Sequence, residues 1–420
     1  MQKILKNIKG TKDILPGEVE VWQYVENTVH LFFKNFGYEQ IRTPKFENTA
    51  LFNRSIGLDT DIVNKEMYSW TDQGGNNLTL KPEVTASVVR SFIQHKLGKI
   101  NNINKLYYID SLFRRERPQK GRFRQFEQFG IEALGSDYPE IDAEIISMAY
   151  YLYDSLKIEN LKLKINSIGS KKTRLIYKKE LTDYLTNYKN DLSNISQKRL
   201  STNPLRILDT KIDFEKEIIK DAPKIINYLD SNDKNHFDDI LLFLDQMNIK
   251  YEIDHNLVRG LDYYTKTVFE IYSDLLGAQT ALCGGGRYDY LIEELGGEST
   301  PAIGFAAGLE RLILSLDIQK HNIHEDPFIY FIALGDDAIK YSSVIANNLR
   351  IKQNLKVVTN SLRKNLKAQM KEANKLNTPY VIIIGDDEIK NNFAIIKNMI
   401  SGDQNNIDLK KIEDFFKKLH

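Results

Sequence analysis

The sequence has little of the chemistry on which secreted or membrane-bound proteins depend. Its 420 residues contain one cysteine, Cys283, which excludes an intrachain disulfide framework and a metal site built from several cysteines. No apolar run approaches the roughly 18 residues that a membrane-spanning helix needs. The lysine-rich N-terminus lacks the apolar core and cleavage site of a targeting segment. We therefore expect a cytoplasmic protein that makes no membrane contact.

The chain also lacks a large net charge and the common nucleotide-binding motifs. The 58 Lys and Arg residues are balanced by 57 Asp and Glu residues, which gives a formal charge of +1. Any RNA contact must therefore come from a local basic patch rather than from bulk charge. The chain has no P-loop, no Rossmann GxGxxG and no HExxH motif. If it binds a nucleotide, it does so in another way, and no metal-ligating residues are predicted.

Length and composition indicate an ordinary globular protein. A chain of 420 residues predicts two or three domains. Hydrophobic residues make up 42% of the chain and charged residues 27%, which is typical of such proteins.

The segment 106–132, LYYIDSLFRRERPQKGRFRQFEQFGIE, carries the strongest functional pattern. It predicts two strands joined by a Pro-Gln-Lys-Gly turn. Residues two apart on a strand share a face. Arg114 and Glu116 are therefore expected to point the same way on the first strand. On the second strand, one face is expected to carry Arg124, Phe126, Gln128 and Glu132. Residues 114–124 include six basic residues and one acidic residue. Such faces suit a triphosphate, a purine and an amino group, whereas the alternative is an exposed hairpin with weak surface ion pairs.

This segment resembles motif 2 of class II aminoacyl-tRNA synthetases, and its sequence from Phe113 to Gly130 is similar to that of the histidyl-tRNA synthetase family. Six further segments resemble those of the family and follow in the same order along the chain, so the resemblance covers essentially the whole chain. They are IKGTKDILPGE (8–18), TLKPEVTASVVR (79–90), NPLRILDTK (203–211), LVRGLDYYTKTVFE (257–270), CGGGRYDYLIEELGG (283–297) and PAIGFAAGLERL (301–312).

The expected architecture is an α+β class II core, an antiparallel sheet flanked by helices, with a helical insertion and a C-terminal α/β domain. The core spans residues 1–320 and the charge-rich insertion about 170–250. The resemblance implies that the insertion approaches the tRNA acceptor arm, although a solvated helical bundle gives the same pattern. Apolar runs that alternate with amphipathic helices predict mostly parallel strands over 327–420, which resembles an anticodon-binding domain.

A helix over 18–36 that leads into a strand over 38–43 resembles motif 1, which builds the dimer interface in this family. Val21, Val25 and Val29 recur at helical spacing, and Gly37 suits the C-terminal cap. Any amphipathic helix before a strand would look the same. The resemblance nevertheless implies a homodimer.

The remaining segments supply candidate residues for an amino-acid substrate. Glu83 and Thr85 follow a Pro-fixed turn and can accept hydrogen bonds from an ammonium group, but they also suit the start of a helix. The glycines 284–286 indicate either close backbone packing against a substrate or a strand bulge. The resemblance assigns L-histidine to a set of six side chains: Glu83, Thr85, Gln128, Glu132, Tyr264 and Tyr288.

Other residues are candidates for ATP and for the reaction itself. The strand, turn and helix start at 304–311 place Arg311 near a helix N-terminus, a common triphosphate site. Arg259 precedes Gly260 and could stabilise charge at the α-phosphate, or it could pair with Asp262. The resemblance makes Arg259 the catalytic residue and implies that Mg²⁺ bridges the phosphates. It assigns ATP to Arg114, Glu116, Phe126 and Arg311.

The turn of the hairpin is expected to meet RNA. The resemblance places Gln119 and Arg124 at the tRNA acceptor end, where the extra 5′ guanosine of histidine tRNA is read. Two positions depart from the family pattern. Lys81 replaces an Arg, and Glu127 stands where bacterial relatives often carry His; strand parity turns Glu127 away from Phe126 and Gln128.

The sequence therefore predicts an enzyme that joins histidine to histidine tRNA through a histidyl-adenylate. Two alternatives come from other classes. A histidine-sensing regulatory subunit would lose the C-terminal module and the catalytic arginines, all of which this chain retains. A non-enzymatic RNA-binding protein would leave the ATP and histidine residues without a role.

Overall fold

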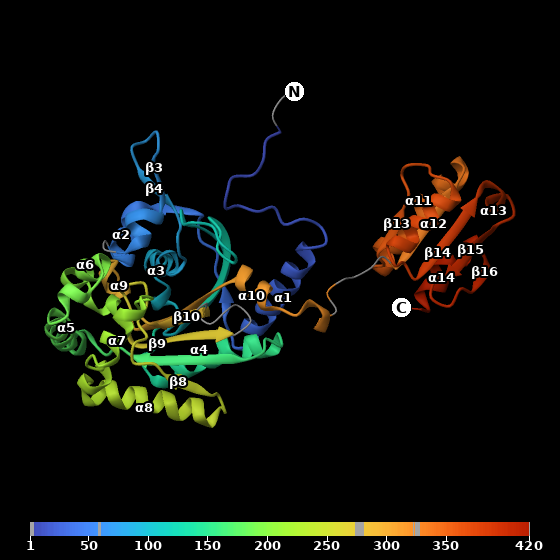
Figure 1. The fold of residues 1–420 in the computed structure, drawn as a ribbon. Helices are drawn as coiled ribbons and strands as arrows, with labels where there is room; N and C mark the ends of the chain where they lie inside the picture. The colour runs from blue at the N-terminus through green and yellow to red at the C-terminus, as the bar shows by residue number, and fades with distance from the viewer. Residues whose placement is uncertain (1–3, 58–59, 274–280, 322, 324–327, 420) are drawn as a thin grey trace. The chain divides into compact units, whose positions relative to one another are not determined.

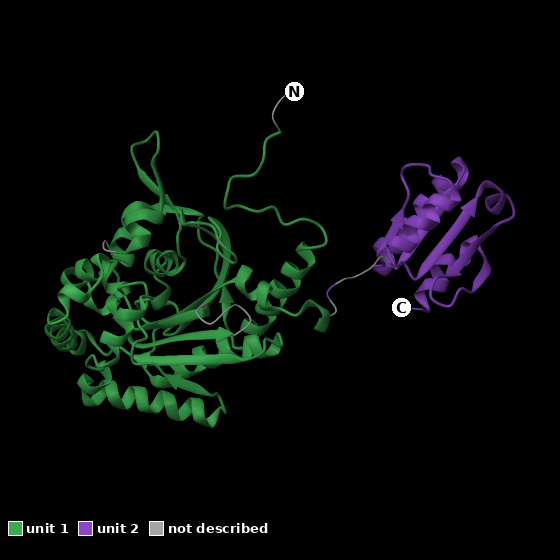
Figure 2. Cartoon of the chain, in the orientation of Figure 1, with its two compact units in different colours: residues 1–321 green, residues 322–420 purple. Residues whose placement is uncertain are grey.

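The computed structural model describes residues 4–57, 60–273, 281–321, 323 and 328–419. Contacts divide the chain into two compact units, residues 1–321 and 322–420 (Figure 2). Each unit has its own sheet and its own hydrophobic core. Among the helices described, none combines the length and apolar character required to cross a membrane.

The first unit is built on an eight-stranded sheet with the order β1-β5-β6-β11-β10-β9-β7-β8 (Figure 1). Every neighbouring pair is antiparallel except β1–β5 and β7–β8 at the two edges, which are parallel. The expected antiparallel sheet flanked by helices is thus confirmed, with parallel edges added. The strands are β1 (Glu39–Gln40), β5 (Asn104–Phe113), β6 (Gln125–Leu134), β7 (Leu161–Ser167), β8 (Tyr251–Ile253), β9 (Thr265–Ser273), β10 (Ala281–Arg287) and β11 (Ala302–Gly308).

Helix α1 (Val19–Asn35) forms where the sequence predicts it. Val21, Val25 and Val29 are buried along one face, and Gly37 adopts the left-handed conformation (φ +76°) that ends the helix. The strand expected over 38–43 is shorter, because only the two residues of β1 pair with β5.

The remaining elements of this part surround the sheet. A separate three-stranded sheet has the order β2-β4-β3. Its strands and the helices near it are β2 (Phe46–Asn48), α2 (Thr49–Ile56), β3 (Tyr68–Thr71), β4 (Asn77–Leu80), α3 (Thr85–Gln94), α4 (Pro139–Ser155), α9 (Leu291–Glu294) and α10 (Leu309–Ser315).

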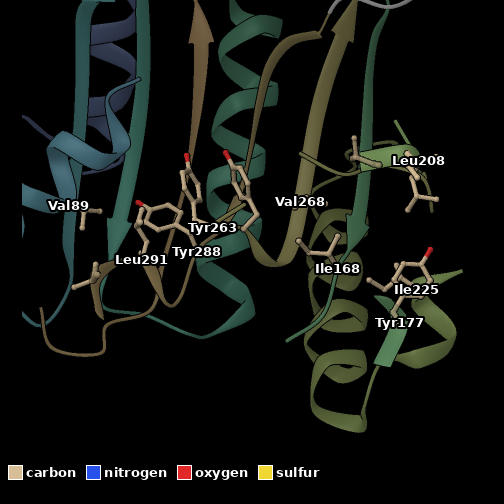
Figure 3. Close-up of a cluster of buried hydrophobic side chains, with 14 of the residues drawn as sticks. Val89, Ile168, Tyr177, Leu208, Ile225, Tyr263, Val268, Tyr288 and Leu291 are labelled. Carbon is tan, nitrogen blue, oxygen red and sulfur yellow. The ribbon is translucent and has the colours of Figure 1, made fainter. Parts of the chain in front are cut away.

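The segment between β7 and β8 is helical, as the charge-rich pattern predicts. Its helices are α5 (Lys171–Thr186), α6 (Asn194–Thr202), α7 (Asp213–Lys220) and α8 (Ser231–Gln246). They share one core with the main sheet: Tyr177, Leu208 and Ile225 of the insertion belong to the same buried cluster as Val268 of β9 and Tyr288 (Figure 3). The insertion is therefore anchored to the elements that carry the candidate residues.

The second unit contains a five-stranded sheet with the order β13-β12-β14-β15-β16. The first three strands are parallel, as expected, whereas β15 and β16 pair antiparallel. Strand β16 and helix α13 are not predicted by the sequence pattern. The elements are β12 (Ile329–Leu334), α11 (Asp336–Gln353), β13 (Val357–Thr359), α12 (Leu366–Lys375), β14 (Tyr380–Gly385), α13 (Asp386–Lys390), β15 (Phe393–Asn398), β16 (Gln404–Asp408) and α14 (Ile412–Lys417).

Candidate active site

A polar cavity of about 930 Å³ in the first unit gathers most of the candidate residues. Its floor comes from the central strands β6, β9, β10 and β11. All residues expected to hold histidine or ATP line it, together with the expected catalytic arginine: Glu83, Thr85, Arg114, Glu116, Phe126, Gln128, Glu132, Arg259, Tyr264, Tyr288 and Arg311. Gln119 and Arg124 are not among the described residues that line it. Segments more than 200 residues apart in the sequence therefore meet at one site.

The predicted hairpin forms, but its strands are shorter than the sequence suggests. Strand β5 ends at Phe113 and β6 begins at Gln125, so the expectation that Arg114, Glu116 and Arg124 are strand residues is wrong. One further backbone bond, from Arg114 N to Arg124 O (2.9 Å), closes the base of the loop. The Pro and Gly of the turn fit this loop, in which Gly121 has φ +70°. Both Arg114 and Glu116 still reach the cavity from the loop.

Two guanidinium groups make one region of the cavity positive. Arg114 is fixed by a hydrogen bond from Nε to the Pro82 carbonyl (2.9 Å), and its guanidinium lies 5.4 Å from the centre of the Phe126 ring. Arg311 donates from Nη1 to the Ala281 carbonyl (2.9 Å). These contacts use only part of each guanidinium, so both can still donate to a polyphosphate. The surface ion pair between Arg122 and Glu116 (3.6 Å) exists beside them, as the hairpin alternative expected.

A second region of the cavity is built around the carboxylate of Glu132. Its carboxylate accepts hydrogen bonds from Thr85 Oγ1 (2.7 Å), from the Tyr288 hydroxyl and from the Tyr108 hydroxyl (3.4 Å). Burial raises the pKa of Glu132 to about 8, and the nearby Glu83 acts in the same direction, against these hydrogen bonds. Gly304 leaves the space that this carboxylate fills, because a Cβ there would lie 2.8 Å from Glu132 Cδ. The three hydroxyls fix this carboxyl group in the cavity, where a ligand with a positive charge would favour its ionised form.

Glu83 satisfies both interpretations of its motif. Its Oε1 accepts a hydrogen bond from Ala86 N (2.9 Å) at the start of α3, so it does cap that helix. It is also buried and lines the cavity, and this burial raises the pKa of its carboxyl group. Thr85, in contrast, donates its hydroxyl proton to Glu132. Thr85 therefore orders a neighbouring carboxylate inside the same cavity.

Arg259 pairs with a residue that the sequence analysis did not identify. Its guanidinium forms an ion pair with Glu270 of β9, whose carboxylate also accepts a hydrogen bond from the Tyr272 hydroxyl. Asp262, the partner considered from the sequence, accepts a hydrogen bond from Asn203 (2.8 Å). A charged residue within the otherwise apolar run TVFEIYS was the signal that could have identified Glu270, because a lone carboxylate in a central strand needs a function or a partner.

The glycines of β10 serve different purposes. Gly284 lines the cavity and makes room for Arg259, since a Cβ there would lie 2.5 Å from Arg259 Cζ. The pairing of β9 with β10 shifts register between Gly286 and Arg287, so the bulge considered from the sequence is present. The close backbone packing thus involves protein groups on the cavity wall.

Three tyrosines form an aromatic wall. The rings of Tyr263 and Tyr264 lie 4.7 Å apart, and those of Tyr263 and Tyr288 lie 5.7 Å apart. Figure 3 shows Tyr263 and Tyr288 side by side. Tyr263 also lines the cavity but was not predicted from the sequence. Such a wall, with hydroxyls and Glu132 beside it, suits a flat polar ring.

Both departures from the family pattern lie outside the cavity. Glu127 accepts a hydrogen bond from Ser111 on the neighbouring strand, as its parity predicts. Lys81 is wholly buried and forms an ion pair with Asp110, while its Nζ also donates to Thr43 Oγ1 (2.9 Å). A compact ammonium can satisfy these acceptors, so Lys81 has a structural partner.

Two further acidic or basic residues were missed. Glu310 lines the cavity and accepts a hydrogen bond from Glu127 N (2.9 Å), and burial raises its pKa to about 7. Arg287 is fully buried beside Tyr288 and donates to the Asp142 carboxylate and to the Ser136 carbonyl (2.9 Å). Arg287 is the one charged residue of β10, so a signal like that of Glu270 was present there.

Comparisons with known proteins agree with this geometry. Residues 10–312 match a family model described as Histidyl-tRNA synthetase, and residues 329–419 match one described as Anticodon binding domain. The chain is 46% identical to a histidine–tRNA ligase of Geobacillus sp. (strain WCH70), with 98% of each chain covered, and 47% identical to that of Acetivibrio thermocellus, with 96% of each covered. It also resembles a crystal structure of apo Staphylococcus aureus histidyl-tRNA synthetase at 38% identity and a TM-score of 0.84, covering 99% of this chain and 100% of the other.

Proposed function

Because the chain belongs to the histidyl-tRNA synthetase family, we propose how its residues carry out the reaction of a histidine–tRNA ligase. The enzyme activates L-histidine with ATP to histidyl-adenylate and transfers the histidyl group to the 3′ end of histidine tRNA. The observation that carries the assignment of residues is one cavity that combines two guanidinium groups, a buried carboxylate framed by hydroxyls, and Arg259.

Arg114, Phe126 and Arg311 hold ATP in this proposal. The contact of Arg114 with the Phe126 ring leaves a ring face and a guanidinium at the same place, which suits a purine and a phosphate respectively. Arg311 supplies a second fork for the terminal phosphates, and Glu116 adds an acceptor at the loop. Class II ATP binding of this kind needs no P-loop, in agreement with the absence of that motif.

The framed carboxylate and the aromatic wall hold histidine. Glu132 and Gln128 reach the imidazole ring and the amino group, Glu83 and Thr85 support the ammonium end, and Tyr264 and Tyr288 flank the ring. A pocket that bonds both imidazole nitrogens rejects apolar isosteres strongly, because they would leave its buried polar groups unpaired.

Arg259 stabilises the first transition state. A histidine carboxylate oxygen attacks the α-phosphorus of ATP, the bond to pyrophosphate breaks, and negative charge builds on the phosphoryl oxygens. The Arg259 guanidinium meets that charge, while Glu270 fixes its orientation before the substrates arrive. In the second step, a ribose hydroxyl of the tRNA 3′ end attacks the acyl carbon and AMP leaves.

Mg²⁺ fits the donor set of this site. Within the described ranges, no three His, Cys, Asp or Glu side chains form a ready-made metal cluster. Mg²⁺ that arrives with phosphates needs only one or two protein carboxylates, and Glu310 and Glu116 line the cavity near the arginines that hold ATP. The ion would neutralise phosphate charge there.

The tRNA contacts and the assembly complete the proposal. Gln119 and Arg124 read the acceptor end from the hairpin loop, and residues 327–420 bind the anticodon, with residues 1–320 as the catalytic domain and about 170–250 as its insertion. Two chains form a homodimer in the cytoplasm. The exposed Leu31 on α1 supports an interface at this helix.

Histidine-dependent ATP–pyrophosphate exchange tests the catalytic assignment. Arg259→Ala should lower the exchange rate by about 10²–10³-fold, which is typical when a transition-state charge contact is lost. Arg363→Ala is the matched control, since that arginine is exposed and pairs with Asp336 in the second unit. Near-normal exchange by folded Arg259→Ala protein would remove Arg259 from the mechanism.

A further inference from the structure

The N-terminal segment contains a tight turn over residues 7–11. Both the backbone N and the Oγ1 of Thr11 donate to the Ile8 carbonyl (2.9 and 2.8 Å), and Asn7 Nδ2 donates to the Thr11 carbonyl (2.9 Å). Gly10 lies at the tip of this turn with φ +92°, a conformation that favours glycine. The motif is therefore a small preformed unit, although it contributes nothing to the cavity lining.

Gly10 docks on the base of the acceptor-reading loop, residues 114–124. Its carbonyl accepts a hydrogen bond from Arg124 N (2.7 Å). A Cβ at Gly10 would lie 2.8 Å from Arg124 Cγ and 2.9 Å from Pro118 Cγ, closer than side chains tolerate. The turn thus touches the loop in its middle, at Pro118 beside Gln119, and where it re-enters the sheet, at Arg124.

The side chain of the ATP-binding arginine on the same loop has anchors of its own, although its backbone N donates to the Arg124 carbonyl (2.9 Å). Arg114 is held by the Pro82 carbonyl and lies near the Phe126 ring, and neither partner belongs to the N-terminal turn. A disturbance at Gly10 therefore moves Pro118 and the Arg124 side chain first. It leaves the anchor of the ATP-binding arginine in place.

We propose that Gly10 is a positioning residue for the acceptor end of tRNA, acting through Pro118 and Arg124. The inference rests on the proposed role of Gln119 and Arg124 in reading the acceptor end. The turn holds the loop in one position, so that Gln119 and Arg124 meet RNA in a single arrangement. Without this contact, the loop samples several arrangements, and RNA binding must first order it.

The test compares two glycines of the same segment. Gly10→Ala adds a methyl group against Arg124 and Pro118, whereas Gly17→Ala adds one at a similar φ (+95°) with no atom within 4 Å. Any effect of backbone strain alone is therefore shared. Gly10→Ala should raise the KM for histidine tRNA about tenfold, since a shift of about 1 Å can cost as much as 10²-fold. The KM for ATP and the rate of pyrophosphate exchange should stay near those of Gly17→Ala, which should charge tRNA normally.

Gln119→Ala, measured in the same assays, separates the inference from the function on which it rests. If Gln119→Ala impairs charging while Gly10→Ala and Gly17→Ala give the same KM for tRNA, the positioning role is overturned. An equal loss of exchange and charging in Gly10→Ala also overturns it, because that pattern reports general damage. If Gly10→Ala raises the KM for tRNA while Gln119→Ala is normal, Gly10 positions the loop and another side chain reads the RNA.

Discussion

Replacing Gly284 with alanine should disable the enzyme through Arg259, although Gly284 has no side chain. The added Cβ would lie 2.5 Å from Arg259 Cζ, whereas ordinary contact begins at 3.4 Å. The nearest guanidinium atom, Nη1, would lie only 2.3 Å away, so the group must move by about 1.1 Å, and the ion pair with Glu270 limits where it can go. A displacement of about 1 Å in a reacting constellation can cost about 10²-fold in rate, equivalent to about 2.7 kcal/mol.

The assay is single-turnover formation of histidyl-adenylate, which separates chemistry from binding. We expect the rate to fall about 10²-fold while the KM values for histidine and ATP change little, because the proposed role of the arginine is in the transition state. Gly260→Ala is the control: it adds a methyl group at the exposed residue next to Arg259, where the nearest atom is 4.0 Å away. In the Gly284→Ala background, Arg259→Ala should cost little more. Fully additive losses, or a normal rate for folded Gly284→Ala protein, would refute the reasoning.

Three further predictions concern other parts of the molecule. Because burial raises the pKa of Glu132 to about 8, wild-type stability should fall as pH rises from about 5 to 8; in Glu132→Gln protein this fall should be smaller by a few kcal/mol, seen as a Tm difference that grows with pH. A constant Tm difference would contradict the assignment. A chain that ends at His321 should form adenylate but charge limiting tRNA poorly, and equal charging by both chains would count against anticodon binding by the second unit. Gln119→Ala should reduce charging far more than exchange, and by less when the 5′ guanosine is already missing; additive losses would mean that the loop does not read this nucleotide.

The sequence predicts the fold best where local pattern and burial agree. Helix α1 follows from apolar periodicity, and strands β12 to β15 of the second unit follow from apolar runs, because the same residues pack into the core. Strand β16 was missed because its residues are mainly exposed and polar, and only pairing with β15 makes it a strand. The parallel edges of the main sheet have the same cause: pairing between distant segments leaves no trace in either one.

The candidate site shows a similar division. Residues with a distinctive local motif, such as Arg259 and Arg311, were identified from the sequence and meet in the cavity. Glu270 and Tyr263 were not identified, because only the folded chain brings Glu270 to Arg259 and sets the ring of Tyr263, in the turn before β9, beside those of Tyr264 and Tyr288. The strand assignment of Arg114 failed because β5 ends one residue earlier, where the Pro-Gly turn draws the chain into a loop. Local sequence patterns indicate the type of chemistry, whereas the fold determines which neighbouring residues complete the site.

The glycines of β10 and β11 also restrict how this active site can evolve. A pocket changes its specificity most easily when one wall residue can be replaced by a larger or smaller one. Here any side chain at Gly284 meets Arg259, and any at Gly304 meets Glu132, so enlarging these floor residues would displace the side chains proposed for catalysis and for histidine recognition before a new substrate fitted. Routes to a different amino acid must therefore begin at wall positions that carry side chains, such as Gln128.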